Sequence, residues 1–201
     1  MNRASIPPPL TAVLLLISTA TAILTLLNGQ SQFAEYYFLS VYERVAGVGL
    51  PEVLSGQVWR LISPIFLHFG FVHFAFDMIW LYGLGRLIEA RIGTLRFGVL
   101  AIGGAIASNL AQYYAVGPIF GGMSGVDYAL FGYALMRERR NPTGYYGLAV
   151  SNAVVMLGWF VLCWLGIIGS VANWAHAGGL IFGGLLALLD FAGEGRYRRF
   201  A

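Results

Sequence analysis

The chain has 201 residues, of which 58% are hydrophobic and only 10% are charged, and its mean hydropathy is +0.72. Soluble domains carry about 25% charged residues, so this composition excludes an ordinary soluble domain and, with apolar runs near 20 residues long, predicts an integral membrane protein. The net charge of +3 comes from arginines beside apolar segments, which argues against nucleic acid as a partner. The one cysteine, Cys163, excludes a disulfide framework and is interpreted as a core residue.

Six apolar segments have the properties of membrane spans. We predict spans over residues 10–28, 63–85, 95–116, 124–136, 145–168 and 173–192. The first follows Arg3, as a signal peptide would, but its apolar run continues to Leu27 without a polar cleavage region. We therefore expect one all-α membrane domain over residues 1–201, built as a six-helix bundle, with no soluble domain before it.

The arginines test this number of spans. With a cytoplasmic N-terminus, all but two of the 12 arginines fall in cytoplasmic segments, the exceptions being Arg44 and Arg60. Positive residues are enriched on the cytoplasmic side of membrane proteins. The pattern thus predicts that both termini are cytoplasmic.

The segment between the first two spans, residues 29–62, is long and rich in aromatic side chains. These include Phe33, Tyr36, Tyr37, Phe38 and Tyr42. Such a composition predicts amphipathic structure that lies in the outer membrane interface.

The fourth span is short and begins at an unusual stretch, FGGMSGVDYALFGY, residues 120–133. From Ser124 to Arg137 a helix rises about 20 Å, whereas the hydrocarbon is about 30 Å thick. If Arg137 marks the inner boundary, Ser124 lies roughly 10 Å below the outer one. The free N–H groups of a helix that starts there are tolerated only beside protein or a water-filled cavity.

Other polar residues reach the same depth. By the same measure, His73 on the second span and His176 on the sixth lie level with Ser124, about 20 Å above the cytoplasmic boundary. Asp77 and Asp127 lie about one turn deeper on their helices. Ionisable groups at this depth are costly and by default indicate function.

The residue types indicate nucleophilic catalysis. A serine hydroxyl is a weak nucleophile that needs a base, and histidine is the usual one, so Ser124 would attack a carbonyl while His176 takes its proton. A helix that begins at the serine directs N–H groups and its positive dipole end at the forming oxyanion. Gly122 and Gly125 would let a substrate backbone come close.

Each of these features also has a simpler interpretation. Gly179 and Gly183 share a helix face with His176 and would let spans four and six approach closely, but such glycines, like G-x-S-G, often serve packing alone. His68 is either a structural hydrogen-bonding residue or part of a water path at the membrane surface. The joint occurrence of the polar groups at one depth favours the catalytic interpretation.

Three stretches together resemble the rhomboid family of intramembrane serine proteases, in particular its bacterial GlpG type. They are GGMSG followed by Tyr128, ANWAHAGGLIFG, and LHFGFVHFAFD, and the similarity extends from Trp59 to Asp190. The resemblance implies a Ser–His dyad without a third acidic member, an acyl-enzyme intermediate and no cofactor or metal. It also implies cleavage of single-span membrane proteins near the outer end of their helix, by an inner-membrane enzyme whose active site opens to the periplasm.

The resemblance also assigns roles to residues of this sequence. The catalytic pair would be Ser124 and His176, with an oxyanion hole formed by His73, Asp77, Gly122 and Ser124, and with support from Tyr128, Gly125 and Gly179. Trp59 and Arg60 would anchor the first loop, and Glu89 would be a structural acid at the end of span two. Span five and the following loop, rich in Trp159, Phe160 and Trp164, would form a lateral gate and cap.

Two acids depart from the family pattern. The family has asparagine where this chain has Asp77, and an ionised carboxylate there would repel an oxyanion. Asp77 would either stay protonated and donate a hydrogen bond to the oxyanion, or pair with His73 at i+4 and keep that ring charged. Alternatively, the substitution is simply tolerated, or it makes the activity weak or pH-dependent. Asp127 replaces an apolar or small residue and would bond to a neighbouring helix or orient His176.

Three other functions are weighed against the protease. A catalytically weak or inactive rhomboid-like protein would bind transmembrane helices without cutting, although such relatives usually lose the serine or the histidine. A small transporter or proton channel needs a polar path to the cytoplasm, which the lower halves of the spans do not offer. Its polar residues would be His68, His73, Asp77 and Asp127. A zinc protease using His73, Asp77 and His176 would lack the H-E-x-x-H motif and leave G-x-S-G unexplained.

Overall fold

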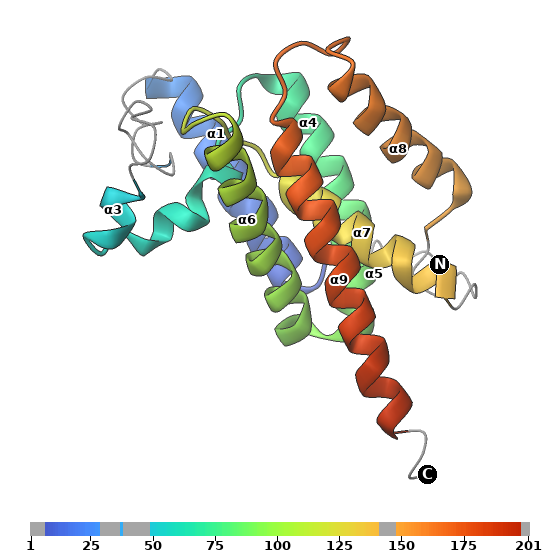
Figure 1. The fold of residues 1–201 in the computed structure, drawn as a ribbon. Coiled ribbons are helices and arrows are strands. Elements are labelled where there is room, and N and C mark those ends of the chain that lie inside the picture. The colour runs from blue at the N-terminus through green and yellow to red at the C-terminus, as the bar shows by residue number, and fades with distance from the viewer. Residues whose placement is uncertain (1–6, 29–36, 38–48, 141–147, 198–201) are drawn as a thin grey trace.

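The computed structural model describes residues 7–28, 37, 49–140 and 148–197. This part of the chain is helical and contains no strand (Figure 1). The helices are α1 Pro9–Asn28, α3 Pro51–Leu54, α4 Phe71–Trp80, α5 Arg86–Ile92, α6 Thr94–Ala115, α7 Ser124–Arg140, α8 Val150–Trp164 and α9 Asn173–Tyr197. Short 3₁₀ turns cover Val58–Leu61 and Ser63–Phe66, and a π turn over Leu81–Gly85 joins α4 to α5.

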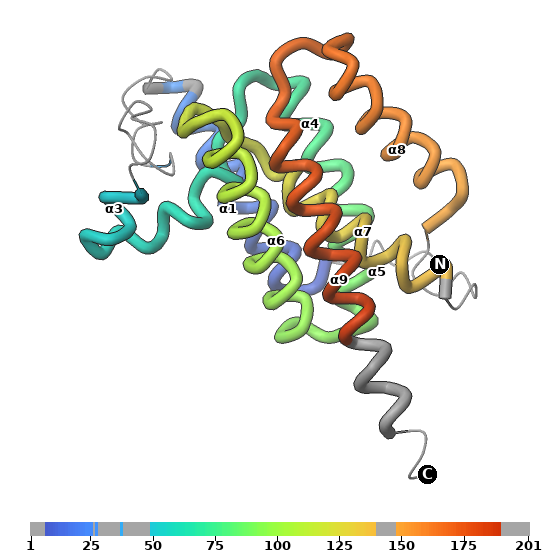
Figure 2. Tube along the Cα trace, in the orientation of Figure 1, coloured from blue at the N-terminus to red at the C-terminus, as the bar shows by residue number. Residues whose placement is uncertain are grey.

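Helix α7 is the centre of the bundle, between α9, α6 and the α4–α5 segment (Figures 1 and 2). Every residue from 125 to 134 is buried. Glycines allow this close approach: a Cβ on Gly183 of α9 would collide with the backbone carbonyl of Ala129, and one on Gly179 with that of Gly125. The glycine face predicted for span six thus packs directly on α7.

Several helix ends differ from the predicted ones. The second span does not begin at residue 63, because Pro64 lies in a 3₁₀ turn and Gly70 takes φ 114°, so that the helix starts at Phe71. Helix α7 begins at Ser124 as predicted but ends at Arg140 rather than 136. Helices α8 and α9 run over 150–164 and 173–197 instead of 145–168 and 173–192.

The exposed surface is apolar. Helix α1 buries hydroxyl side chains at Thr11, Ser18 and Thr21, and exposes large apolar ones such as Leu16 at 69%. This is the reverse of a helix in water and fits a surface that faces lipid tails. Among the described residues, Phe71–Ile92 and Thr94–Ala115 are long and apolar enough to cross a membrane, and the apolar helices Pro9–Thr25, Val150–Trp164 and Asn173–Leu189 are shorter.

The buried carboxyl group of Glu89 joins α1 to α5 and α6. It accepts hydrogen bonds from the backbone N–H groups of Leu10 and Thr11 at 2.9 and 2.7 Å, and from the hydroxyls of Thr11 and Thr94 at 2.7 and 2.9 Å. These donors include the first N–H groups of α1, which have no partner within their own helix. The carboxyl group thus connects the start of α1 with α5 and α6.

The first loop leaves the bundle sideways at α3 (Figure 1). Arg60 is buried and its Nε donates to Gln57 Oε1 at 2.8 Å, whereas Trp59 is 55% exposed. Most of the loop's aromatic residues, Phe33, Tyr36, Phe38 and Tyr42, lie outside the described residues. The prediction of interfacial amphipathic structure therefore stays a prediction for them.

Candidate active site

Ser124 is the first residue of α7, and a tight loop leads into it. Gly122 takes φ 125°, a conformation that L side chains rarely adopt. Its N–H donates to Pro64 O at 3.1 Å, while the next N–H, of Met123, donates to Asp77 Oδ2 at 2.7 Å. One hydrogen bond to the turn before α4 and one to α4 itself thus fix the backbone just before the serine.

The hydroxyl of Ser124 contacts the imidazole of His176. The distance from Oγ to Nε2 is 2.8 Å, across the α7–α9 interface. If the hydroxyl donates to Nε2, the neutral ring carries its hydrogen on Nδ1. Nδ1 is buried without a hydrogen-bond partner among the described residues, so no third acidic group orients the ring there.

Tyr128 packs on the imidazole from one turn further along α7. The two ring centroids lie 4.6 Å apart with an interplanar angle of 34°. The Tyr128 hydroxyl donates to Met156 O on α8 at 3.0 Å. The ring therefore limits the orientations of His176, and its hydroxyl joins α7 to α8.

Gln112 on α6 is a residue that the sequence analysis missed. Its Oε1 accepts the N–H groups of Trp174 and Ala175 at 3.1 and 3.3 Å. These N–H groups lie in the first turn of α9, directly before His176, and that of Ala175 also donates to Ala172 O at 3.0 Å. A buried amide in a predicted span was the signal that could have identified it.

The backbone donors around Ser124 differ from those predicted. The N–H of Gly122 already bonds to Pro64 O and is not free for an oxyanion. The N–H of Ser124, at the start of α7, is the predicted backbone donor that remains, with His73 beside the loop. A Cβ on Gly122 would lie 2.6 Å from His73 Nε2, which places that nitrogen against the residues before Ser124.

The two glycines of G-x-S-G face protein rather than open space. A Cβ on Gly125 would lie 2.5 Å from the Ser108 hydroxyl, and one on Gly122 would meet His73 and Asp77. The predicted role, close approach of a substrate backbone, is thus wrong for Gly125. Its neighbours show that it lets α6 and α7 pack.

Asp77 is buried beside two histidines. Its Oδ2 lies 3.4 Å from His73 Nε2 and 3.3 Å from His68 Nε2, in addition to accepting the Met123 N–H. Of the two arrangements expected for Asp77, this geometry favours pairing with His73 over donation to an oxyanion. The contact with His68 was not foreseen.

Asp127 forms neither of the expected contacts. Both carboxyl oxygens are buried without a hydrogen-bond partner among the described residues, and His176 Nδ1 is not bonded to them. An unpaired carboxyl group in an apolar bundle is stable only in its protonated form. We have no functional account of this residue.

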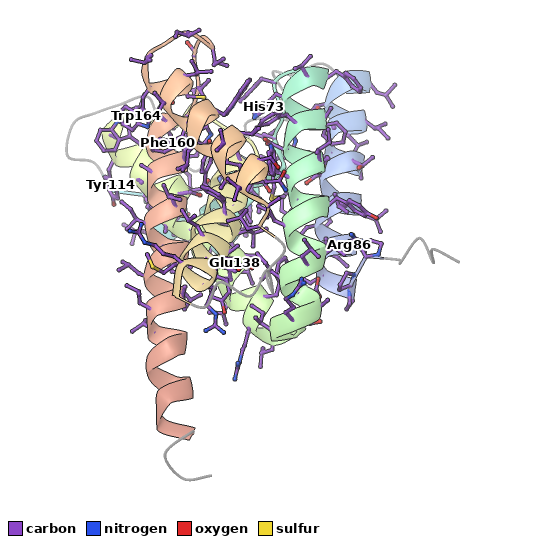
Figure 3. The ribbon with its side chains drawn as sticks, turned by 90° about the vertical axis from the view of Figure 1, so that its right-hand side faces the viewer. His73, Arg86, Tyr114, Glu138, Phe160 and Trp164 are labelled. Atoms are coloured by element: carbon purple, nitrogen blue, oxygen red, sulfur yellow. The ribbon has the colours of Figure 1, made fainter. Side chains whose placement is uncertain are left out.

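Aromatic side chains of α8 contact aromatic residues of α4 and α7. Trp159 stacks on Phe76 of α4 with centroids 4.7 Å apart, and Phe160 contacts Tyr128 at 5.5 Å. Figure 3 places His73, Phe160 and Trp164 toward one end of the molecule and Arg86 and Glu138 toward the other. The role of span five and the following loop as a lateral gate and cap, which the resemblance implies, stays a prediction.

Within the described part of the chain, no three His, Cys, Asp or Glu side chains are grouped so that they could hold a metal ion. The zinc-protease alternative therefore gains no support from the arrangement of His73, Asp77 and His176.

Comparison with known proteins identifies the family. The family model described as the rhomboid domain matches residues 55–193, which include every residue of the site above. The chain belongs to the rhomboid family. Among curated rhomboid proteins, it is 37% identical over 185 residues to the rhomboid protease GlpG of Pectobacterium atrosepticum, and 39% identical over 139 residues to the rhomboid protease GlpG of Salmonella paratyphi A.

The rhomboid relatives are longer than the aligned region. The alignments cover 90% and 69% of this chain but only 63% and 50% of the Pectobacterium and Salmonella proteins. The matched region, residues 55–193, shows that this rhomboid chain belongs to the family and has the location of an integral membrane protein.

Proposed function

We propose that this protein is an intramembrane serine endopeptidase with a catalytic dyad of Ser124 and His176. The observation that carries the proposal is the 2.8 Å contact between Ser124 Oγ and His176 Nε2 at the start of a helix within the bundle. Nucleophile and base are within hydrogen-bond distance, as acyl transfer requires.

The proposed reaction proceeds in two steps. Ser124 Oγ attacks the peptide carbonyl while its proton moves to His176 Nε2, and the carbonyl oxygen becomes an oxyanion beside the Ser124 N–H and His73. When the C–N bond breaks, His176 gives the proton to the leaving amine and an acyl-enzyme remains. Water, deprotonated by the same histidine, then releases the acid and restores Ser124.

The substrates we propose are single-span membrane proteins cut near the outer end of their helix. The depth of Ser124 along α7 and the apolar exposed surface support a substrate that arrives through the bilayer. The names of the relatives, rhomboid protease GlpG, support proteolysis as the activity. We further propose six spans in a bacterial inner membrane, with cytoplasmic termini and an active site open to the periplasm.

A catalytically weak protein that binds transmembrane helices is the second candidate. The observation that favours it is the carboxyl group of Asp77, which contacts His73 and the backbone just before Ser124. An ionised and unpaired acid there would raise the energy of the oxyanion by charge repulsion.

The test is cleavage of a single-span model substrate by the purified protein in detergent. We expect the parent to release two fragments and both Ser124→Ala and His176→Ala to release none. A parent that binds several such substrates without cutting any would favour the second candidate. Cleavage that persists in Ser124→Ala would contradict the proposed dyad.

A further inference from the structure

Asp77 is the common neighbour of three groups beside the proposed oxyanion hole. Its Oδ2 accepts the Met123 N–H at 2.7 Å and lies at ion-pair distance from the Nε2 atoms of His68 and His73. The side chains of Asp77 and His68 are each 1% exposed, whereas that of His73 is 33% exposed. The acid and His68 are thus enclosed, and His73 is the member of the cluster that reaches the site.

The surroundings of His68 determine where its hydrogens lie. Its Nδ1 is 3.1 Å from Phe66 O, a carbonyl that only accepts, so Nδ1 carries a hydrogen. Its Nε2 is 3.3 Å from Asp77 Oδ2, close enough for an ion pair although not aligned as a hydrogen bond. If neither His68 Nε2 nor Asp77 Oδ2 carried a hydrogen, two acceptors would face each other in a buried site. One proton therefore lies between these two atoms.

The bond from Met123 places that proton on the histidine. The same Oδ2 atom accepts a short hydrogen bond of 2.7 Å from the Met123 N–H. An ionised carboxylate oxygen is a stronger acceptor than the hydroxyl oxygen of a protonated carboxyl group. His68 is then an imidazolium and Asp77 a carboxylate. Their opposite charges cancel in the interior, where an unpaired charge would be strongly destabilising.

We propose that His68 and Asp77 form a buried ion pair that positions the oxyanion hole. The carboxylate holds the Met123 N–H, and thereby the backbone before Ser124, and keeps a hydrogen on His73 Nε2, the nitrogen beside Gly122. The positive charge of His68 cancels the charge that would otherwise repel the oxyanion. The proposal rests on the proposed function, and within it His68 and Asp77 are positioning residues.

The titratable groups around Asp77 are His68 from the preceding loop, His73 on the same helix, Asp127 from α7 and His176 from α9. At acidic pH, every variant loses activity as the base His176 becomes protonated. Replacing His68 leaves the Asp77 carboxylate unpaired beside the oxyanion, so activity falls in that variant but not in one that also lacks the acid.

A double-mutant cycle of His68→Asn and Asp77→Asn tests the pairing. In the His68→Asn variant, the introduced amide can still donate to Phe66 O, as Nδ1 does, but it lacks the nitrogen that faces Asp77. We expect His68→Asn to lower kcat/KM about 30-fold through kcat when Asp77 is present. In the Asp77→Asn background, the same change should alter kcat/KM within about twofold.

A packing control separates charge pairing from loss of shape. The Phe74 ring packs edge-on against His68 with centroids 5.3 Å apart. Phe74→Leu disturbs this neighbour without touching the charges, so its effect should be the same in the parent and in Asp77→Asn. An equal loss for His68→Asn in these two backgrounds would overturn the proposal, because it would mean that His68 acts through packing alone.

Nitrogen NMR of histidine-labelled protein gives a readout that does not depend on catalysis. The chain has three histidines, so the His68 signals are identified by their absence from His68→Asn. We expect protonated-type shifts for both ring nitrogens in the parent and an acceptor-type Nε2 in Asp77→Asn. A neutral His68 in the parent would overturn the ion pair, whereas a charged His68 in a protein that cleaves nothing would contradict the proposed function instead.

Discussion

Tyr128 shows how a single residue serves the site in two separable ways. Its ring lies 4.6 Å from the His176 ring, and its hydroxyl donates to Met156 O at 3.0 Å. The ring restricts the base, and the hydroxyl stabilises the α7–α8 contact. Substitutions that remove one feature at a time distinguish these contributions.

We predict that Tyr128→Phe lowers the free energy of unfolding by about 1 kcal/mol through the lost hydrogen bond and leaves kcat near that of the parent. Tyr128→Ala should lower the free energy of unfolding by about 3–5 kcal/mol. It should also reduce kcat, because His176 loses its packing surface. Unfolding in detergent and cleavage rates measure the two effects. A Tyr128→Phe variant as inactive as Tyr128→Ala would show that the hydroxyl, not the ring, matters for catalysis.

Residue spacing predicted that Ser124 and His176 lie at one depth, but it did not predict their surroundings. Ser124 and His176 were identified because helices have a fixed rise, so distance from the charged boundary gives depth. The pairing of His68 with Asp77 was not predictable in this way. It depends on how the loop before α4 folds back, and no periodic pattern encodes that fold.

Helices α7 and α9 are held together by glycine contacts. A Cβ at Gly183 would collide with the Ala129 backbone, whereas at the next residue, Gly184, a Cβ would meet nothing within 4 Å. The two neighbouring glycines thus form a matched pair for testing whether close helix approach holds Ser124 beside His176.

We predict that Gly183→Ala lowers the free energy of unfolding by roughly 1–3 kcal/mol, because α7 and α9 must separate to admit the methyl group. Gly184→Ala should be neutral or stabilise the helix by up to about 1 kcal/mol. Cleavage should fall in the first variant only, since separation lengthens the Ser124–His176 contact. Equal behaviour of the two variants in unfolding and cleavage assays would contradict this account.

The predicted helices were most accurate where they are regular. The third predicted span, 95–116, differs by one residue at each end from α6, Thr94–Ala115. The second was wrong at its start because the apolar composition continues through Pro64 and Gly70, where the backbone is not α-helical. Hydropathy measures the preference of side chains for an apolar environment, so it does not detect breaks in the helical backbone.

Charge asymmetry belongs to the whole molecule. Arginines cluster on the side assigned to the cytoplasm, and Arg86 and Glu138 lie toward the end of the bundle opposite His73 (Figure 3). The site lies nearer the other end. The sequence therefore predicts orientation as well as fold class, through a rule that concerns the membrane rather than contacts within the protein.

We predict that a fluorescent protein fused to the C-terminus is fluorescent in the bacterial cytoplasm, and that alkaline phosphatase fused within the first loop is active in the periplasm. The physical reason is the retention of arginine-rich segments on the cytoplasmic side. Fusions of each reporter at both positions provide the controls. An active phosphatase at the C-terminus would contradict an even number of spans with cytoplasmic ends.

The most direct test of the central claim is covalent labelling of the purified protein with a phosphonofluoridate, followed by mass spectrometry. An activated serine attacks the phosphorus, forms an Oγ–P bond and releases fluoride. We predict one adduct, on Ser124, that is absent from Ser124→Ala and strongly reduced in His176→Ala. A protein that cleaves its substrate while Ser124 remains unlabelled, or that carries the adduct on another residue, would contradict the proposed dyad.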